Sequence, residues 1–236
     1  KVLFIYATGG WDVSYCFAPM LDSDLVDTES DATAAEVNGI PFVDHESRPA
    51  VRTFFETYGD QTSIINGIEC RSVAHDVCLR LSMTGSTLPG LDDWPAILAS
   101  RSSYDRLLPM VNISGPSYTA GLASEVVRVG TNGQFSALMN GSAFLDASDL
   151  LVTAPEAAIE ALEDAYALSR AEQAAGAALR GREQEILAAA AIAEERMAQL
   201  AEVADGLELA SGTNLVERAD ILAECFEKSM SRCGMV

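Results

Sequence analysis

The segment at residues 71–76 (Arg-Ser-Val-Ala-His-Asp) places a nucleophile, a cation and two metal-ligating side chains close together. The hydroxyl of Ser72 is placed to act as a nucleophile, and Arg71 can neutralise a tetrahedral anion such as phosphate or sulfate. His75 and Asp76 offer an imidazole nitrogen and a carboxylate oxygen, both of which bind divalent metals. A simpler interpretation is that Ser72 caps a helix and that Asp76 supports its first turn.

A second polar loop, at residues 9–12 (Gly-Gly-Trp-Asp), directly follows an apolar run. Paired glycines let the backbone turn tightly, so Asp12 can present a hard oxygen ligand to a divalent cation such as Zn, Mg, Mn or Ca. The spacing equally allows Asp12 to cap the helix that follows. Two other polar stretches predict no site: residues 21–36 are interpreted as a solvated acidic loop, and His45 as an exposed side chain rather than a ligand.

Predicted strands and helices alternate around these loops. Residues 1–7 form a continuous apolar run, the pattern of a strand buried on both faces. Residues 49–58 repeat apolar side chains at helical spacing, and residues 62–67 predict a second strand. The helix expected at residues 73–84 follows the Ser72 loop and ends at Gly85.

Two further strands are predicted at residues 108–113 and 126–129. Alternation of this kind implies crossovers between parallel strands, so the expected fold class is α/β, with a mainly parallel sheet flanked by helices. Parallel strands deliver their following loops to the same edge of a sheet. We therefore expect Asp12, Ser72 and His75 to converge at that edge.

The composition changes near residue 153, where a capping-box pattern opens a stretch rich in Ala, Glu, Leu and Gln. We interpret residues 1–152 as the α/β portion and residues 153–210 as a helical hairpin appendage. Residues 211–236 predict a returning helix, capped by Gly234, that leads to a strand beyond the end of the sequence. The alternative for residues 153–210 is a dimerising coiled coil, which would make the protein a homo-oligomer.

Composition and charge limit the classes of function. Apolar residues make up 49% of the 236 residues, which is enough for a sizeable core. The formal net charge of −20 opposes phosphate backbones, so we expect no nucleic-acid partner. No run reaches the length of about 20 apolar residues that a transmembrane helix requires. The five cysteines lack CxxC spacing, and Cys78 and Cys225 lie on apolar helical faces as small buried hydrophobes.

Three groups of motifs occur in a recognisable order along the first 150 residues. They are the apolar run and Gly-Gly-Trp-Asp of residues 2–14, the Arg-Ser-Val-Ala-His-Asp and Met-Thr-Gly of residues 54–85, and the Ser-Gly-Pro-Ser-Tyr of residues 114–118. In these motifs the sequence resembles a widespread family of bacterial proteins that usually carry twin-arginine export signals. That family is placed in the alkaline-phosphatase and sulfatase superfamily.

The resemblance implies an alkaline-phosphatase-like fold, with Asp12 as a metal ligand and Ser72 and His75 in the nucleophile-bearing loop. It also implies an exported, periplasmic or extracellular, metal-dependent hydrolase whose substrate is a small anionic phosphate or sulfate ester. Members of the superfamily draw further Asp and His ligands from their C-terminal half, so we expect this sequence to be the N-terminal portion of such an enzyme. The alternative is a non-catalytic surface or assembly protein that uses the same scaffold to bind a protein partner.

Overall fold

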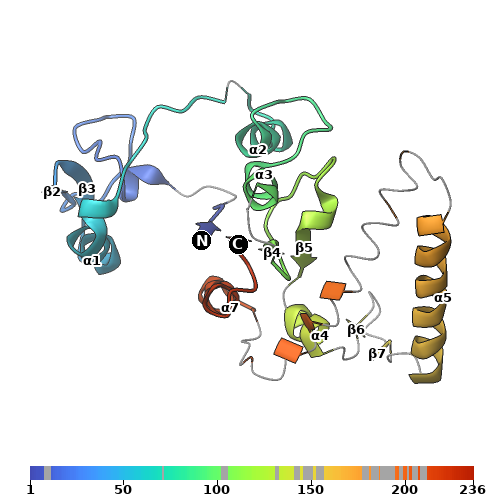
Figure 1. Cartoon of the computed structure of the whole chain (residues 1–236). Helices are drawn as coiled ribbons and strands as arrows, with labels where there is room; N and C mark the ends of the chain where they lie inside the picture. Colours follow the sequence, from blue (N-terminus) through green and yellow to red (C-terminus); the bar gives the residue numbers. More distant parts are fainter. Residues whose placement is uncertain are drawn as a thin grey trace. The chain divides into compact units, whose positions relative to one another are not determined.

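The structure is a computed structural model (Figure 1), and it describes residues 1–7, 12–70, 72–101, 106–130, 133–140, 144–145, 151–152, 157–176, 181, 186, 195–196, 199–200, 202–203, 207 and 212–236. The chain divides into a first unit, Lys1–Tyr6 with Ser72–Val236, and a second unit, Ala7–Arg71. None of the helices within the described residues is long and apolar enough to cross a bilayer.

The first unit contains a sheet of four parallel strands. Their order is β1 (Val2–Phe4), β8 (Cys233–Met235), β4 (Met110–Ile113) and β5 (Val126–Val129). β8 pairs in parallel with both β1 and β4, and β4 pairs in parallel with β5. The prediction of a mainly parallel sheet is therefore confirmed. β1 differs from the expectation of a strand buried on both faces, because it lies at an edge of this sheet and its Leu3 stays 39% exposed.

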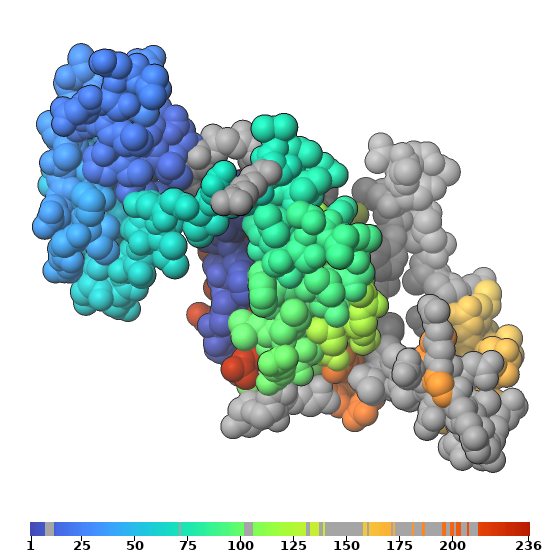
Figure 2. All heavy atoms as spheres, turned by 90° about the horizontal axis from the view of Figure 1, so that it is seen from above, coloured from blue at the N-terminus to red at the C-terminus, as the bar shows by residue number. Residues whose placement is uncertain are grey.

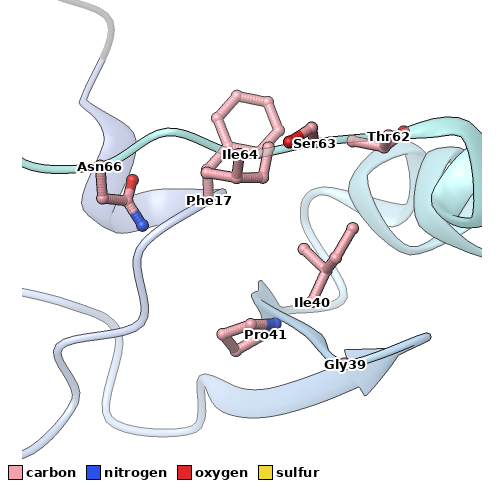
Figure 3. A pocket seen from close by; sticks show the side chains of 8 residues that line it. All are labelled: Phe17, Gly39, Ile40, Pro41, Thr62, Ser63, Ile64 and Asn66. Atoms are coloured by element: carbon pink, nitrogen blue, oxygen red, sulfur yellow. The ribbon is translucent and has the colours of Figure 1, made fainter.

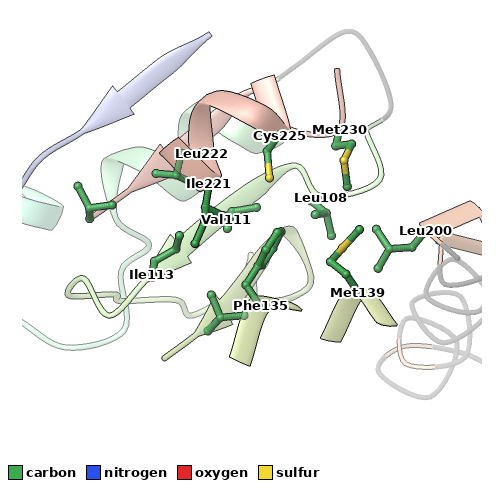
Figure 4. Close-up of a cluster of buried hydrophobic side chains, with 12 residues drawn as sticks. Leu108, Val111, Ile113, Phe135, Met139, Leu200, Ile221, Leu222, Cys225 and Met230 are labelled. Carbon is green, nitrogen blue, oxygen red and sulfur yellow. The ribbon is translucent and has the colours of Figure 1, made fainter. Parts of the chain in front are cut away.

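Helices cover both faces of this sheet. Along β4, Met110 belongs to one apolar cluster and Val111 to the other, as the alternation of side chains along a strand predicts. α2 (His75–Thr84) and α3 (Trp94–Ser100) contribute to the first cluster. α4 (Gln134–Asn140) contributes to the second (Figure 4), together with the last helix of the chain. The first unit is thus an α/β/α arrangement of three layers.

The C-terminal helix and strand differ from the sequence-based expectation. α7 (Leu215–Glu227) is followed by a strand within the sequence, β8, whereas the next strand was expected beyond residue 236. Gly234 lies in this strand and does not cap the helix. A Cβ at Gly234 would lie 2.7 Å from Cδ1 of Leu222, so the glycine allows α7 to pack closely against the sheet.

The segment at residues 153–210 is described only in part. α5 (Ala157–Gly176) confirms a helix in its first half. Leu200 is only 8% exposed and belongs to the apolar cluster of α4 and α7, with Val203 and Leu207 packed against that cluster. This part of the expected appendage therefore packs against the core instead of protruding from it. The rest of the predicted hairpin lies outside the described residues.

The second unit is built around a β-hairpin and one helix, and its residues are the group of blue to cyan spheres in Figure 2. β2 (Thr33–Val37) and β3 (Ile40–Asp44) pair in antiparallel fashion. Between them, Asn38 and Gly39 have φ angles of 53° and 80°, as a two-residue hairpin turn requires. α1 (Pro49–Tyr58) follows and contacts β3. The interpretation of residues 21–36 as a loop is therefore wrong for its last four residues.

Aromatic rings form the core of the second unit. Phe55 of α1 is fully buried and stacks on Phe42 of β3, with 4.7 Å between the ring centroids. Phe17 meets Phe55 edge-on, at 5.9 Å between the centroids. The helix predicted at residues 49–58 is confirmed, but two members of its apolar face, Phe54 and Tyr58, remain exposed.

Residues 62–67 do not form the predicted strand. Neither helix nor strand occurs from residue 62 to residue 70, and Ile65 and Ile68 are each 76% exposed. Gly67 has a φ of 79°, which interrupts an extended backbone. An apolar β-branched run favours a strand only when a neighbouring strand pairs with it and covers its side chains, and this context is not encoded in the run itself.

The remaining elements are short: the 3₁₀ helices η1 (Val13–Tyr15), η2 (Gly59–Gln61) and η3 (Ala123–Glu125), and the antiparallel pair β6 (Phe144–Leu145) and β7 (Leu151–Val152).

Arg48, the residue before α1, ties separate parts of the second unit together. Its guanidinium donates to both carboxylate oxygens of Glu29. Its Nε donates to the carbonyl oxygen of Tyr15 at 3.1 Å, and the guanidinium lies over the ring of Tyr15, 4.9 Å from the centroid. Hydrogen bonding by Arg48 lowers the pKa of Glu29 to about 2.

This ion pair predicts a loss of stability in acid. The pKa of Glu29 falls from 4.5 to about 2 on folding, so its stabilising contribution is complete above about pH 4.5 and disappears as the pH falls toward about 2. Glu29→Gln should therefore make the urea midpoint fall less between neutral pH and about pH 3 than it does in the unmodified protein. Equal falls in the two proteins would show that the pair does not stabilise the fold.

Candidate functional site

The loop that follows β4 is shaped by one buried side chain, Asn112. Asn112 is 2% exposed; its Nδ2 donates to the carbonyl oxygen of Pro116 at 3.1 Å, and its Oδ1 accepts from the N–H of Gly115 at 2.8 Å. A Cβ at Gly115 would lie 2.7 Å from Cγ of Met235, so only glycine fits there without displacing that side chain. This loop leaves the carboxyl edge of the sheet, where ligands bind in open α/β folds.

Two adjacent aspartates fix the continuation of this loop. Asp93 is fully buried; it caps α3 by accepting from the N–H of Ala96 at 2.9 Å, and it accepts from the N–H of Tyr118 at 2.8 Å. Asp92 accepts from the N–H groups of Ala120 at 2.7 Å and Leu122 at 3.0 Å. These charge-assisted bonds anchor the loop after β4 to the start of α3.

α2 contacts the chain where it leaves the carboxyl ends of two strands. The hydroxyl groups of Tyr6, just after β1, and Ser82 of α2 are hydrogen-bonded at 3.0 Å. The guanidinium of Arg80 lies 5.9 Å from the ring centroid of Tyr118, in the loop after β4. The C-terminal half of α2 therefore packs beside this edge of the sheet, and Ser72 lies before the other end of the same helix.

Ser72 is half-buried and lies three residues before α2. Its Oγ accepts from the N–H of Ala74 at 3.1 Å, and its carbonyl oxygen accepts from Sγ of Cys78 at 3.2 Å. Ala74 is the N-cap residue of α2, and its side chain makes no capping hydrogen bond. The interpretation of Ser72 as the helix cap is therefore wrong. Among the described residues, no side chain accepts from the first N–H groups of the helix, an arrangement that favours a bound anion.

His75 and Asp76 occupy the first two positions of α2, and both side chains are exposed. Successive helical residues point about 100° apart around the axis, so the two side chains diverge. Asp76 also complements the positive end of the helix dipole. Their donor atoms suit a divalent metal, but two protein ligands are fewer than the three or four of a typical zinc site.

Asp12 is exposed and caps η1. Its Oδ1 accepts from the hydroxyl of Ser14 at 2.5 Å and from the N–H of Ser14 at 2.9 Å, and these hydrogen bonds lower the pKa of Asp12. The capping interpretation that the spacing left open is therefore confirmed. Asp12 belongs to the second unit and Ser72 to the first. Arg71 lies outside the described residues. The convergence of Asp12, Ser72 and His75 at one edge of the sheet stays a prediction.

Across the part of the chain that the structure describes, no three His, Cys, Asp or Glu side chains gather closely enough to hold a metal ion. No family model matches the chain, and no curated protein or solved structure matches it. The fold class therefore rests on the strand order and the two apolar clusters alone. The alkaline-phosphatase-like topology and the metal site remain proposals.

The prediction of a small buried hydrophobe is confirmed for Cys225 but not for Cys78. All five are free thiols. Cys225 is fully buried, and burial raises the pKa of its thiol to about 12, so it carries no thiolate at neutral pH. Cys78 is half-buried and donates to the carbonyl oxygen of Ser72.

His45 is the residue that sequence reasoning placed wrongly. Its side chain is only 10% exposed, and both ring nitrogens are hydrogen-bonded, to Ser47 and to Asp31. Ser47 is two residues away and could have been noticed as a local partner. Asp31 lies two residues before β2 and comes close to His45 because Thr33 pairs with Asp44 in the hairpin, so only that register connects the two residues.

The second unit also contains an open cavity of about 260 Å³. Figure 3 shows it between the hairpin turn, with Ile40 and Pro41, and the irregular segment that carries Ile64 and Asn66. Phe17 closes one side. The walls combine apolar side chains with the hydroxyl residues Thr62 and Ser63 and the amide of Asn66, and none of these residues was predicted from the sequence as part of a site.

Proposed function

We propose that the protein is a metal-dependent hydrolase of small phosphate or sulfate esters, with Ser72 as its nucleophile. The observation that carries this proposal is the start of α2, where the Ser72 hydroxyl lies three residues before the helix, no side chain of the described residues caps the helical N–H groups, and His75 and Asp76 offer potential metal ligands. The other end of α2 contacts the chain beyond the carboxyl ends of β1 and β4.

In this proposal Ser72 Oγ attacks the phosphorus or sulfur atom of the ester and displaces the alcohol. The N–H groups at the start of α2 and the guanidinium of Arg71 bind the oxygens of the tetrahedral group and stabilise the charge that they gain. Water then attacks the seryl ester and releases phosphate or sulfate. A divalent cation held by His75 or Asp76 would supply Lewis-acid polarisation of the ester.

We also propose that the protein acts outside the cytoplasm, as its resemblance to exported proteins implies. A second candidate function is that of a non-catalytic surface or assembly protein on the same scaffold. The observation that favours it is the lack of a group of three potential ligands among the described residues.

Hydrolysis of 4-nitrophenyl phosphate and 4-nitrophenyl sulfate distinguishes the two functions. The purified protein is freed of metal with a chelator, and Zn, Mg, Mn or Ca is added back singly. The hydrolase proposal predicts turnover of at least one ester that is lost on chelation and restored by one of the metals. The absence of turnover under every condition, in a protein whose circular dichroism shows that it is folded, would favour the assembly protein.

A further inference from the structure

A serine, a histidine and an aspartate that the function proposed above does not use are linked by hydrogen bonds in the second unit. Ser47 Oγ lies 2.7 Å from Nδ1 of His45. Nε2 of the same ring lies 3.1 Å from Oδ1 of Asp31. A nucleophile that contacts a base, which a third group orients in turn, is the diagnostic arrangement of nucleophilic catalysis.

The hydrogen bonds identify the tautomer of His45. The backbone N–H of Ser47 donates to Nδ1 at 3.1 Å, so this nitrogen is an acceptor and carries no proton. Nε2 therefore carries the proton and donates it to Asp31. In this state Nδ1 can accept a proton from the hydroxyl of Ser47, and Asp31 can stabilise the imidazolium that forms.

Charged groups around this cluster suit the same chemistry. Nη1 of Arg48 donates to Ser47 Oγ at 3.3 Å, so a cation lies next to the nucleophile, where it can stabilise the negative charge that develops on the carbonyl oxygen of a bound ester. The same guanidinium is held in place by Glu29.

The exposure of the three side chains sets the access for a substrate. The base is nearly buried, at 10% exposure, which keeps the ring in one orientation. Ser47 is exposed, and the side chain of Asp31 is 70% exposed. Because Ser47 is exposed, the acyl group of a short ester can reach its hydroxyl without a change in the surrounding structure.

We propose that Asp31, His45 and Ser47 form a second nucleophilic site, which hydrolyses short-chain carboxylic esters without a metal. Ser47 Oγ bonds to the ester carbonyl carbon while its proton passes to Nδ1 of His45. The tetrahedral intermediate then expels the alcohol, which takes that proton. Water attacks the acyl-serine in the same way, returns its proton to Ser47 through His45, and releases the carboxylic acid.

A fluorophosphonate probe tests this site, because it forms a covalent adduct with activated serines and releases fluoride. We expect one adduct on Ser47, located by peptide mass spectrometry and formed equally well with an excess of chelator. Ser47→Ala should abolish that adduct and the hydrolysis of 4-nitrophenyl acetate. Ser63→Ala, at another exposed serine of the same unit, should change neither.

Asp31→Asn is the sharper variant, because this exposed side chain can be changed without opening the core. It should slow labelling of Ser47 at least about tenfold, since the amide stabilises the imidazolium less well. Ser72→Ala should leave labelling of Ser47 unchanged, which separates this site from the proposed phosphate or sulfate site. A folded protein that gives no adduct on Ser47, or Asp31→Asn labelling at the rate of the unmodified protein, would overturn the proposal.

Discussion

Ser72→Ala is expected to lower the turnover of phosphate and sulfate esters at least about 10³-fold, because removing a catalytic nucleophile leaves only binding and charge stabilisation. The same change should cost the fold no more than about 1 kcal/mol. The only hydrogen bond it removes from the described residues is the one that Oγ accepts from Ala74. Steady-state rates measured beside a urea unfolding curve therefore separate the catalytic effect from the structural one.

Ser86→Ala provides a matched control at the other end of α2. Ser86 Oγ accepts from the N–H of Leu88 at 3.0 Å, the same two-residue turn that Ser72 makes with Ala74. Its removal should leave the hydrolysis rate within about twofold of the unmodified protein. If the two variants lose activity equally, Ser72 acts through local structure and is not the nucleophile.

Phe55→Ala is expected to destabilise the second unit by about 3–5 kcal/mol. Phe55 is fully buried and contacts three other rings, Phe42 at 4.7 Å, Phe54 at 5.3 Å and Phe17 at 5.9 Å. Its removal leaves a cavity that the hairpin and the helix cannot both close. The loss should be visible as a lower urea midpoint and as early proteolytic cleavage within residues 12–70.

Phe54→Ala is the control for this change. Phe54 is the preceding residue of α1 and is 42% exposed, so it loses less apolar contact on truncation. Its edge-on contact with Phe55, at 5.3 Å between centroids, predicts a loss of about 1 kcal/mol. Similar losses for the two variants would contradict the view that the Phe42–Phe55 stack is the core of this unit.

The parallel sheet could be predicted where local signals agree with the tertiary contacts. The runs that became β4 and β5 are apolar, bounded by turn residues, and buried in the fold. α2 ends at Gly85, which has the left-handed conformation that a C-terminal glycine predicts. The β2–β3 hairpin was also within reach, because Asn38-Gly39 between alternating side chains is a strong hairpin signal.

Other elements depend on partners that the local sequence does not reveal. The apolar run at residues 62–67 resembles a strand, yet it forms no ladder. β8 is only three residues long and contains Gly234, which reads locally as the end of a helix. A glycine is needed at position 234 of the strand because Leu222, in the preceding helix α7, packs closely against it.

The candidate site shows the same limits. The spacing around Asp12 allowed a metal ligand or a cap, and the fold shows the cap. Ser72, in contrast, does not form the cap that was the simpler alternative to a nucleophile. Its hydroxyl accepts from the N–H of Ala74, which is the N-cap residue of α2. The His45–Asp31 contact follows from the register of the β2–β3 hairpin, in which Thr33 pairs with Asp44, so it was missed together with that hairpin.

Trapping the covalent intermediate tests the proposed hydrolase most directly. The metal-loaded protein is mixed with a phosphate or sulfate ester, quenched in acid and digested, and the peptide that carries Ser72 is examined by mass spectrometry. We predict a phosphoryl or sulfuryl group on Ser72 that appears with turnover and is absent from Ser72→Ala. Turnover without any modification of Ser72, or modification of a different residue, would contradict its assignment as the nucleophile.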